Sequence, residues 1–380
     1  MDTDEDLRAW LTLVRAPGVG GVGIRALLDR AGSARAACAD ARKYHDSIGL
    51  NPAALEWIGH PDEARLDADL KWLAMPGHRL LRFDEADFPP QLDTIPQPPA
   101  ALFVAGNAAA LLAPQVAIVG SRSATVQGLA TARDFARTLS RAGLTITSGM
   151  ADGIDGAAHA AALDAGRPTI AVVGTGPDIV YPSKHRELAS KIAESGAIVS
   201  EFAPGTEARP GHFPRRNRLI AGLALGTLVV EAGLQSGSLI TARLAGEAGR
   251  EVFALPGSIH NPLAKGCHRL IRDGARLVET AAEVIEALGP AAQALGADLR
   301  ARLEAEEPPA APEGRGSTQD PDYAALLASL GEAPASLDEL AVRTGLAPAA
   351  LSSMLLLLEL EGVVAPAVHG RWQRLFPAGA

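Results

Sequence analysis

The 380-residue sequence has only two cysteines, few aromatic residues and no long hydrophobic run. Cys38 and Cys267 are too few for a disulfide framework or a cysteine-based metal cluster, which favours a reducing, cytoplasmic location. The acidic segment 1–6 lacks the apolar core of a secretory signal. The longest uncharged stretch, Thr94–Ser121, is interrupted by prolines and so does not predict a transmembrane helix. Alanine and glycine are abundant instead, which favours close helix–sheet packing over a β-sandwich.

The chain also lacks a positive net charge, since its formal charge is −9. These charges are unevenly distributed along the sequence. Residues 1–113 carry 11 basic and 16 acidic side chains (net −5), residues 114–280 carry 18 and 14 (net +4), and residues 281–380 carry 6 and 14 (net −8). An anionic ligand is therefore expected to bind the middle segment, although the whole protein is acidic.

Hydrophobic patterns divide the sequence into four parts. Residues 1–72 contain helical patterns at 5–15 and about 24–31 on either side of a glycine-rich turn, which predicts a small helix–hairpin–helix (SAM-like) domain. Residues 73–288 make up a central domain. Residues 289–320 are rich in alanine, proline and glutamate with little apolar periodicity, which predicts a flexible linker.

The remaining residues, 321–380, predict a winged-helix domain. Three helical patterns, at about 323–330, 336–344 and 348–361, precede two short strands around Val363–Val364 and Arg371–Leu375. The third helix is leucine-rich and acidic, whereas a helix that reads duplex DNA carries Arg or Lys for phosphates and base edges. A protein-contact or dimerisation role is therefore favoured over sequence-specific regulation of duplex DNA.

The central domain contains β-branched apolar runs that alternate with helical patterns. The runs have no in–out alternation, so both faces of each strand should be buried, as in a parallel sheet covered by helices. This predicts an α/β fold of the doubly wound, extended Rossmann type. The predicted strands are Val116–Val119, Leu144–Thr147, Thr169–Val173, Ala197–Ser200, Thr227–Val230, Glu251–Leu255 and Arg276–Val278.

Glycine, serine and basic residues follow these strands, at the edge where a doubly wound sheet binds its ligands. Cations at helix N-termini oppose the helix macrodipole, and small residues there expose backbone amides, so a bound polyanion accounts for both features. The alternative, which stays open for any one residue, is that each cation pairs with a nearby carboxylate. The candidate binding residues are Gly120, Ser121, Arg122, Ser148, Gly149, Lys184, Arg216, Asn217, Arg218, Ser236, Gly237 and Ser238.

Several strings in this region occur together in one known family. They are AIVGSRSATVQG (117–128), TSGMADGIDGAAHAAAL (147–163), FPRRNRLIAGL (213–223), VVEAGLQSGSLITA (229–242) and REVFALPGSIHNPLAKGCHRLIRDGA (250–275). In this order they resemble the motifs of the DNA-processing protein A (DprA/Smf) family. The resemblance implies cooperative binding of single-stranded DNA, a homodimer formed through the central domain, and transfer of the strand to a RecA-type recombinase during natural transformation.

The resemblance also assigns roles to candidate residues. Arg122 and Lys184 would form the basic DNA pocket, which would be lined by Ser121, Ser148, Gly149, Arg216, Asn217 and Arg218. Asp152 departs from the family pattern and would weaken the local positive field, which Lys265, a second departure, would restore in part. The nearest aromatic side chains for base stacking are Tyr181, Phe202 and Phe213. We expect a non-enzymatic recombination mediator with no catalytic residue, cofactor or metal ion.

A rival function uses the same pocket differently. An enzyme or sensor with this Rossmann fold would bind a nucleotide derivative there, although the sequence has no Walker A motif for ATP hydrolysis. Preference for a mononucleotide over a DNA strand would identify this rival.

Two weaker motifs also have structural interpretations. Residues 18–23 match G-x-G-x-x-G, but a helical pattern precedes them, so a helix–hairpin–helix is favoured over a dinucleotide site. Whether this hairpin contacts a DNA phosphate or only folds the chain stays open. Asp155 and His159 are four residues apart in a predicted helix, and we expect them to pair with each other rather than form a metal or acid–base site.

Overall fold

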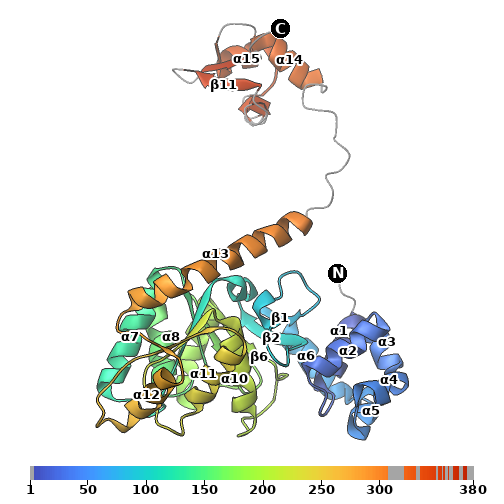
Figure 1. The fold of residues 1–380 in the computed structure, drawn as a ribbon. Helices are drawn as coiled ribbons and strands as arrows, with labels where there is room; N and C mark the ends of the chain where they lie inside the picture. Colours follow the sequence, from blue (N-terminus) through green and yellow to red (C-terminus); the bar gives the residue numbers. More distant parts are fainter. Residues whose placement is uncertain are drawn as a thin grey trace. The chain divides into compact units, whose positions relative to one another are not determined.

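The structure is a computed structural model that describes residues 4–306, 321–330, 334–347, 350–352, 354–355, 358, 363–367 and 371–374. The chain forms two compact units, Met1–Arg300 and Ala301–Ala380. The first unit contains a group of N-terminal helices beside a large sheet with helices on its faces (Figure 1).

The N-terminal helices are short, and three of them have side-chain caps. Side chains of Ser33, Asn51 and Asp62 accept hydrogen bonds from backbone amides in the first turns of α3, α5 and α6. Between α1 and α2, Gly18 has a φ of +76°, which favours glycine, and a Cβ at Gly21 would lie 2.2 Å from the carbonyl oxygen of Pro98. The helices are α1 (Asp4–Arg15), α2 (Gly21–Ala31), α3 (Ala34–Ala39), α4 (Ala41–Ile48), α5 (Pro52–Gly59) and α6 (Glu63–Leu73).

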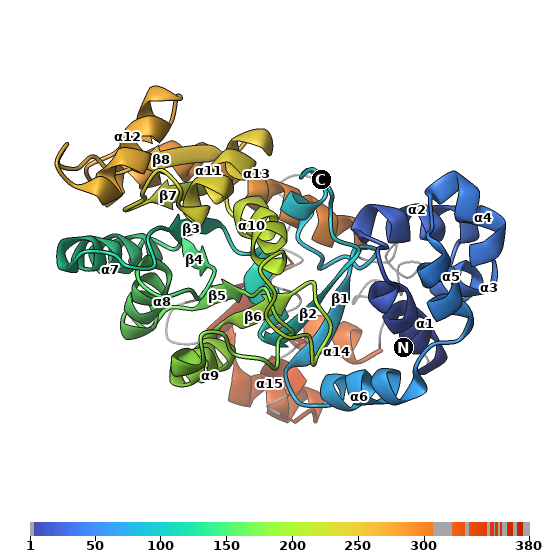
Figure 2. The same cartoon turned by 90° about the horizontal axis from the view of Figure 1, so that it is seen from below.

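These helices share a hydrophobic core with one end of the large sheet. Leu11 and Leu27 belong to the same buried cluster as Ala171 and Ile198, which lie on sheet strands. Both views place α1–α6 beside β1 (Figures 1 and 2). The predicted N-terminal helical domain therefore packs directly onto the central domain.

The large sheet has nine strands in the order β1-β2-β6-β5-β4-β3-β7-β8-β9. Each predicted strand is present with ends that differ by at most one residue, and β3 to β9 pair in parallel, which confirms the doubly wound fold. They are β3 (Gln115–Val119), β4 (Thr145–Ser148), β5 (Thr169–Val172), β6 (Ala197–Ser200), β7 (Gly226–Val229), β8 (Glu251–Ala254) and β9 (Arg276–Leu277).

Two strands were not predicted from the sequence. β1 (His78–Arg82) and β2 (Ala101–Gly106) extend the sheet by antiparallel pairing of β2 with β6 and of β1 with β2. A proline-rich segment separates them, and β2 is paired with a strand about 100 residues further along the chain. The pairing that places β2 in the sheet is therefore long-range, although Ala101–Ala105 form a continuous buried apolar run that the sequence prediction did not use.

Helices cover both faces of the sheet. Residues of α10, α11 and α12 pack in one buried cluster, whereas residues of α7, α8 and α13 pack in another on the opposite face. The bounds are α7 (Val126–Arg141), α8 (Ile154–Asp164), α9 (Arg186–Ser195), α10 (His212–Leu223), α11 (Gly237–Glu247), α12 (Lys265–Arg272) and α13 (Ala281–Glu306).

The flexible-linker prediction for 289–320 is wrong for its first half, because α13 continues to Glu306. Leu288 and Leu295 are buried in the core of the first unit, and Leu299 packs against it. Alanine-rich sequence favours a helix, and these leucines are spaced to lie on one helical face. Residues 307–320 lie outside the described residues, and the predicted domain boundaries stay a prediction.

The second unit has a winged-helix arrangement, as predicted. It contains α14 (Pro321–Leu330), β10 (Ala335–Ser336), α15 (Leu337–Thr344), β11 (Val364–Ala367) and β12 (Arg371–Arg374), and the strands form a sheet in the order β10-β12-β11. Most of the third predicted helix, 348–361, lies outside the described residues. In neither unit is any described helix both long and apolar enough to span a membrane.

Candidate nucleic-acid interface

A pocket of about 700 Å³ lies where the order of the parallel strands reverses. From β3 the sheet grows through β4 and β5 on one side, and from β7 it grows through β8 on the other side. The connections that leave the neighbouring strands β3 and β7 therefore run in opposite directions and leave a crevice between them. Eight predicted binding residues line this switch-point pocket: Gly120, Ser121, Arg122, Arg216, Asn217, Ser236, Gly237 and Ser238.

The loop after β3 is fixed by the end of β7. The amide of Ser121 donates to the carbonyl oxygen of Glu231 at 2.7 Å, and a Cβ at Gly120 would meet that same oxygen at 2.9 Å. The Glu231 carboxylate accepts hydrogen bonds from the backbone amide (2.9 Å) and hydroxyl (2.7 Å) of Thr125, the N-cap of α7. Sequence reasoning missed this role of Glu231, because the contact joins loops over 100 residues apart.

Arg122 extends from this anchored loop into the mouth of the pocket. It is exposed, and within the described parts of the chain no carboxylate lies close enough to form an ion pair with it. Its guanidinium carbon lies 5.6 Å from the centre of the Phe213 ring, and the Tyr181 and Phe213 rings are 5.5 Å apart. A cation and two aromatic side chains are thus presented together at the mouth.

Arg216 is buried in the wall of the pocket and its donors serve the fold. One terminal nitrogen donates to the carbonyl oxygens of Gly149, at 2.8 Å, and Val172. Burial lowers the pKa of Arg216 to about 10, although the nearby Asp155 carboxylate acts in the opposite direction and raises it. Burial also raises the pKa of Asp155 itself. A Cβ at Gly149 would lie 2.6 Å from the guanidinium, so Gly149 makes room for Arg216. This arginine contributes charge to the wall, while its contacts join β4 to β5.

The N-terminus of α11 forms the opposite side of the pocket. Ser236 caps this helix by accepting a hydrogen bond from the amide of Ser238 at 3.3 Å. A Cβ at Gly237 would meet no atom within 4 Å, so its backbone faces open space. The side-chain nitrogen of Asn217, Nδ2, donates to the carbonyl oxygen of Gly237 at 3.4 Å, and this contact connects α10 to the turn. The amides of Ser236, Ser238 and Leu239 donate to neighbouring oxygens, whereas the Gly237 amide has no acceptor among the described residues, so it favours an anion here.

Four predicted binding residues do not line the pocket. The Ser148 hydroxyl donates to the carbonyl oxygen of Ile118 at 2.6 Å, and Gly149 lies behind Arg216. Lys184 pairs with Asp152 at 3.0 Å, and Arg218 pairs with Glu201 at 2.5 Å. The carboxylate alternative therefore holds for Lys184 and Arg218, but the described residues provide no such partner for Arg122.

The expected pairing of Asp155 with His159 is wrong. His159 Nδ1 lies 2.7 Å from the hydroxyl of Thr169, whereas Asp155 accepts from the amides of Gly149 and Ala151. Burial lowers the pKa of His159 to about 3, so the imidazole is neutral near pH 7. Thr169 on β5, rather than Asp155 on the same helix, is the partner of His159, because the fold places its hydroxyl directly beside the buried ring.

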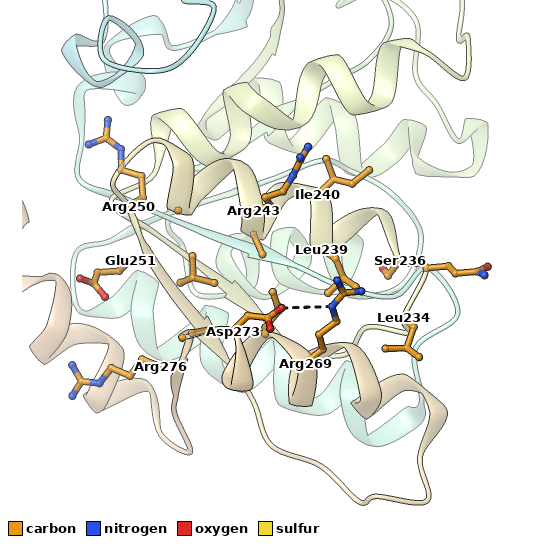
Figure 3. Close-up of a pocket in the computed structure, with 17 residues that line it drawn as sticks. Leu234, Ser236, Leu239, Ile240, Arg243, Arg250, Glu251, Arg269, Asp273 and Arg276 are labelled. Atoms are coloured by element: carbon orange, nitrogen blue, oxygen red, sulfur yellow. Dashed lines mark ion pairs between the residues drawn. The ribbon is translucent and has the colours of Figure 1, made fainter.

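A second pocket of about 700 Å³ runs beside α11 and α12, and sequence reasoning did not predict it (Figure 3). Its rim carries Arg243, Arg250, Arg269 and Arg276. Arg269 pairs with Asp273 at 3.5 Å, and Arg243 pairs with Glu247 at 3.7 Å. Leu234 is half exposed at one end. We call this feature the α11–α12 groove.

Comparison with known proteins identifies the family that carries this site. Residues 79–289 match the family model described as DNA recombination-mediator protein A. The chain belongs to this family. Residues 4–41 match the DprA-like N-terminal HHH domain, and residues 304–368 match the DprA winged helix domain. The resemblance found in the sequence motifs is thereby confirmed.

Individual DprA and Smf proteins are similar over much of the chain. Protein Smf of Escherichia coli is 43% identical over 318 residues, which is 82% of this chain and 81% of that protein. The crystal structure of DprA from Streptococcus pneumoniae aligns with a TM-score of 0.66 at 37% identity, covering 73% of this chain and 97% of that one. A DprA structure from Helicobacter pylori, reported for its single-stranded DNA binding mode, aligns with a TM-score of 0.51 at 30% identity, covering 56% and 95%.

Proposed function

We propose that this DprA family member binds single-stranded DNA in the switch-point pocket. The observation that carries the proposal is the guanidinium of Arg122, which is exposed, lacks a carboxylate partner within the described residues and lies over Phe213. A guanidinium and the Gly237 amide at a helix end, unpaired in the described part of the chain, suit phosphate oxygens, and the exposed Tyr181 ring beside the half-buried Phe213 ring suits a base. The H. pylori relative that binds single-stranded DNA has the same central fold.

The pocket should bind without strong sequence preference. Most of its polar groups are arginines, small hydroxyls and backbone amides, which contact phosphates rather than base edges, and the side-chain amide of Asn217 already donates to the Gly237 carbonyl oxygen. Tyr181 and Phe213 offer stacking surfaces that accept any base. Phe202 is a weaker candidate, because it does not line this pocket and stacks on His212 at 4.2 Å between ring centres.

A competition experiment separates this function from its rival. Labelled single strand should be displaced by unlabelled single strand of any sequence, poorly by duplex, and not by a mononucleotide. Displacement by a micromolar mononucleotide, or release of its base or phosphate, would instead support an enzyme or a nucleotide sensor.

The protein is proposed to act as a mediator rather than as an enzyme, in the cytoplasm, and to pass the strand to a RecA-type recombinase. Membership of the DNA recombination-mediator family supports this step. The measurement is recombinase filament formation on a strand already coated with this protein. Unchanged or slower filament formation would contradict the mediator role.

A homodimer through the central domain is part of the same proposal. β9 is the edge strand of the large sheet, and Leu277 on it is 45% exposed. Leu234 and Ile259 in the same domain are also exposed. An unpaired sheet edge with exposed apolar side chains is suited to contact with a second copy.

A further inference from the structure

Helix α10 separates two pockets and contributes arginines to both. The basic residues of this helix begin at Arg215. The next two residues, Arg216 and Asn217, line the switch-point pocket. Arg215 and Arg218 line another pocket of about 520 Å³, whose opposite wall is the glycine-rich turn between α1 and α2. We call this the hairpin pocket, and its remaining lining comes from Gly18–Gly23, Ile48–Leu50 and Gln97.

The N-terminus of α2 opens into the hairpin pocket without a cap. Gly20 is the N-cap residue, and no side chain accepts a hydrogen bond from the first turn. The amides of Gly21, Val22 and Gly23 belong to that turn and have no acceptor within the helix. They point with the positive end of the helix dipole towards the space beside α10.

Gly20 itself is not needed for the backbone conformation. Its φ is −88°, which any residue adopts, and a Cβ there would meet no atom within 4 Å. Serine, aspartate or asparagine at this position would cap the helix and stabilise it. Glycine leaves the amides open to an external acceptor instead.

Arg218 supplies an independent sign that an anion belongs here. Its side chain is only 9% exposed, and one terminal nitrogen pairs with Glu201 at 2.5 Å. Its Nε and other terminal nitrogen have no hydrogen-bond partner in the described part of the chain. A buried cation with unmade hydrogen bonds is costly, so such donors are normally satisfied by a ligand or water.

The charges around the hairpin pocket leave an excess of one positive unit. Arg215 and Arg218 both pair with the same carboxylate, Glu201, at 3.1 and 2.5 Å. Glu201 is buried, whereas Arg215 is 45% exposed and can turn towards a ligand. Two guanidiniums, one carboxylate and a helix N-terminus together favour a phosphate.

We propose that the hairpin pocket binds a backbone phosphate of the DNA strand that occupies the switch-point pocket, so that the strand crosses α10. This inference rests on the proposed function, because it extends the same DNA path. The proposed ligand is a phosphodiester group of single-stranded DNA. The alternative ligand is a free phosphate ion, which would make the same contacts.

Substitutions at Gly20 test the proposal in the full-length protein. Gly20→Asp adds a carboxylate and caps the amides, Gly20→Asn caps them without charge, and Gly20→Ala adds a methyl group and leaves them free. Thermal unfolding of the Asp and Asn variants should occur at or above the unchanged protein's temperature, because both are preferred caps. Affinity for a long oligothymidylate should fall roughly tenfold for Asp, less for Asn, and hardly at all for Ala.

Salt dependence provides a second readout. Losing one phosphate contact flattens the slope of log K against log salt by about 0.7 for a single strand. Gly20→Asp and Arg215→Ala should each show this flattening, and Arg215→Ala should remain folded because Glu201 keeps its pair with Arg218. An Asp variant with the affinity and slope of the Ala variant would overturn the proposal.

Arg122→Ala separates this proposal from the proposed function. If Arg122→Ala loses binding while Gly20→Asp matches Gly20→Ala, the switch-point site stands and the hairpin site fails. If Gly20→Asp weakens binding while Arg122→Ala does not, the switch-point site fails and the hairpin pocket is a DNA site by itself. If inorganic phosphate raises the unfolding temperature of the unchanged protein but not of Gly20→Asp, and DNA affinity is equal in both, the pocket binds a free ion and the proposal is wrong.

Discussion

The switch-point pocket and the α11–α12 groove have the same volume, about 700 Å³, and both are lined by arginines. They differ in what most of those arginines contact. In the groove, Arg269 and Arg243 pair with carboxylates one helical turn away, and Arg250 donates to the Gln91 carbonyl oxygen and the Thr94 hydroxyl. Within the described residues, Arg276 on the groove rim and Arg122 in the pocket have no carboxylate partner. The two regions also differ in backbone, because the N-terminal turn of α11 contributes Ser236, Gly237 and Ser238 to the switch-point pocket, whereas only Ser236 of these borders the groove.

This difference shows that a count of basic residues does not locate an anion site. An exposed pair on one helix is worth at most about 1 kcal/mol and reduces the field that a phosphate would experience. The Arg122 guanidinium, which has no carboxylate partner within the described residues and lies in the same pocket as the unpaired Gly237 amide, offers its full charge and unused donors. The groove, with exposed leucines near a sheet edge, is better suited to protein contact.

The largest expected effect separates the two regions directly. Arg122→Ala should weaken single-strand binding roughly ten- to hundredfold, because a charge-assisted hydrogen bond contributes about 1.5–3 kcal/mol. Arg243→Ala in the groove is the matched control and should bind like the unchanged protein. Fluorescence anisotropy with a labelled oligonucleotide measures both, and equal losses would show that the pocket assignment is wrong.

A charge introduced at the sheet edge beside the groove tests the protein-contact role of that region. Leu277→Glu should convert a dimer to a monomer at micromolar concentration, since two carboxylates would face each other across the edge. DNA binding should weaken severalfold because one strand no longer engages two sites. Analytical ultracentrifugation gives the mass. A Leu277→Glu protein with unchanged mass would place the dimer interface elsewhere.

Salt dependence sharpens the assignment of phosphate contacts. Arg122→Ala should flatten the slope of log K against log salt by about 0.7 per subunit, and Arg269→Ala should leave it unaltered. Titrations at four salt concentrations suffice to measure the change. A slope near zero for the unchanged protein would contradict phosphate binding altogether.

A smaller effect is expected at the edge of the pocket. Asp152→Asn removes the carboxylate that pairs with Lys184 at 3.0 Å and also lies 3.4 Å from His185. Binding should become about two- to threefold tighter at low salt, and the gain should disappear at high salt, because the pair is exposed and screened. The double variant with Lys184→Ala is the control. It should bind no more tightly than Lys184→Ala alone.

The smallest effect is expected from removing the second unit. Truncation after Glu306 keeps Leu295 and Leu299 in the core of the first unit and should change single-strand affinity less than about twofold, since the removed part is acidic. Truncation after residue 290 is a different experiment, because it would expose the core that these leucines cover. A large loss after truncation at Glu306 in a folded protein would assign the winged helix to the DNA site.

The sequence was a good guide where function and fold leave local patterns. Strands β3 to β7 are buried at every residue, so each is a largely apolar run bounded by glycine and polar residues. The ends of all seven parallel strands were predicted within one residue. The same runs place Gly120, Ser121 and Arg122 at a strand end, and the topology rule for doubly wound sheets then predicts a ligand there. The family resemblance is also local, since it rests on contiguous motifs.

The tertiary structure alone decided which side chains are free to bind. Nothing local distinguishes Arg122 from Arg216 or Arg218, yet burial commits Arg216 to carbonyl oxygens, and Glu201 takes one terminal nitrogen of Arg218. Edge strands β1 and β2, the anchoring contact of Glu231, and the meeting of α10 with the N-terminal turn all join residues far apart in the chain. A hydrogen-bond donor has a limited number of bonds to make, and only the folded neighbours determine whether those bonds are already made.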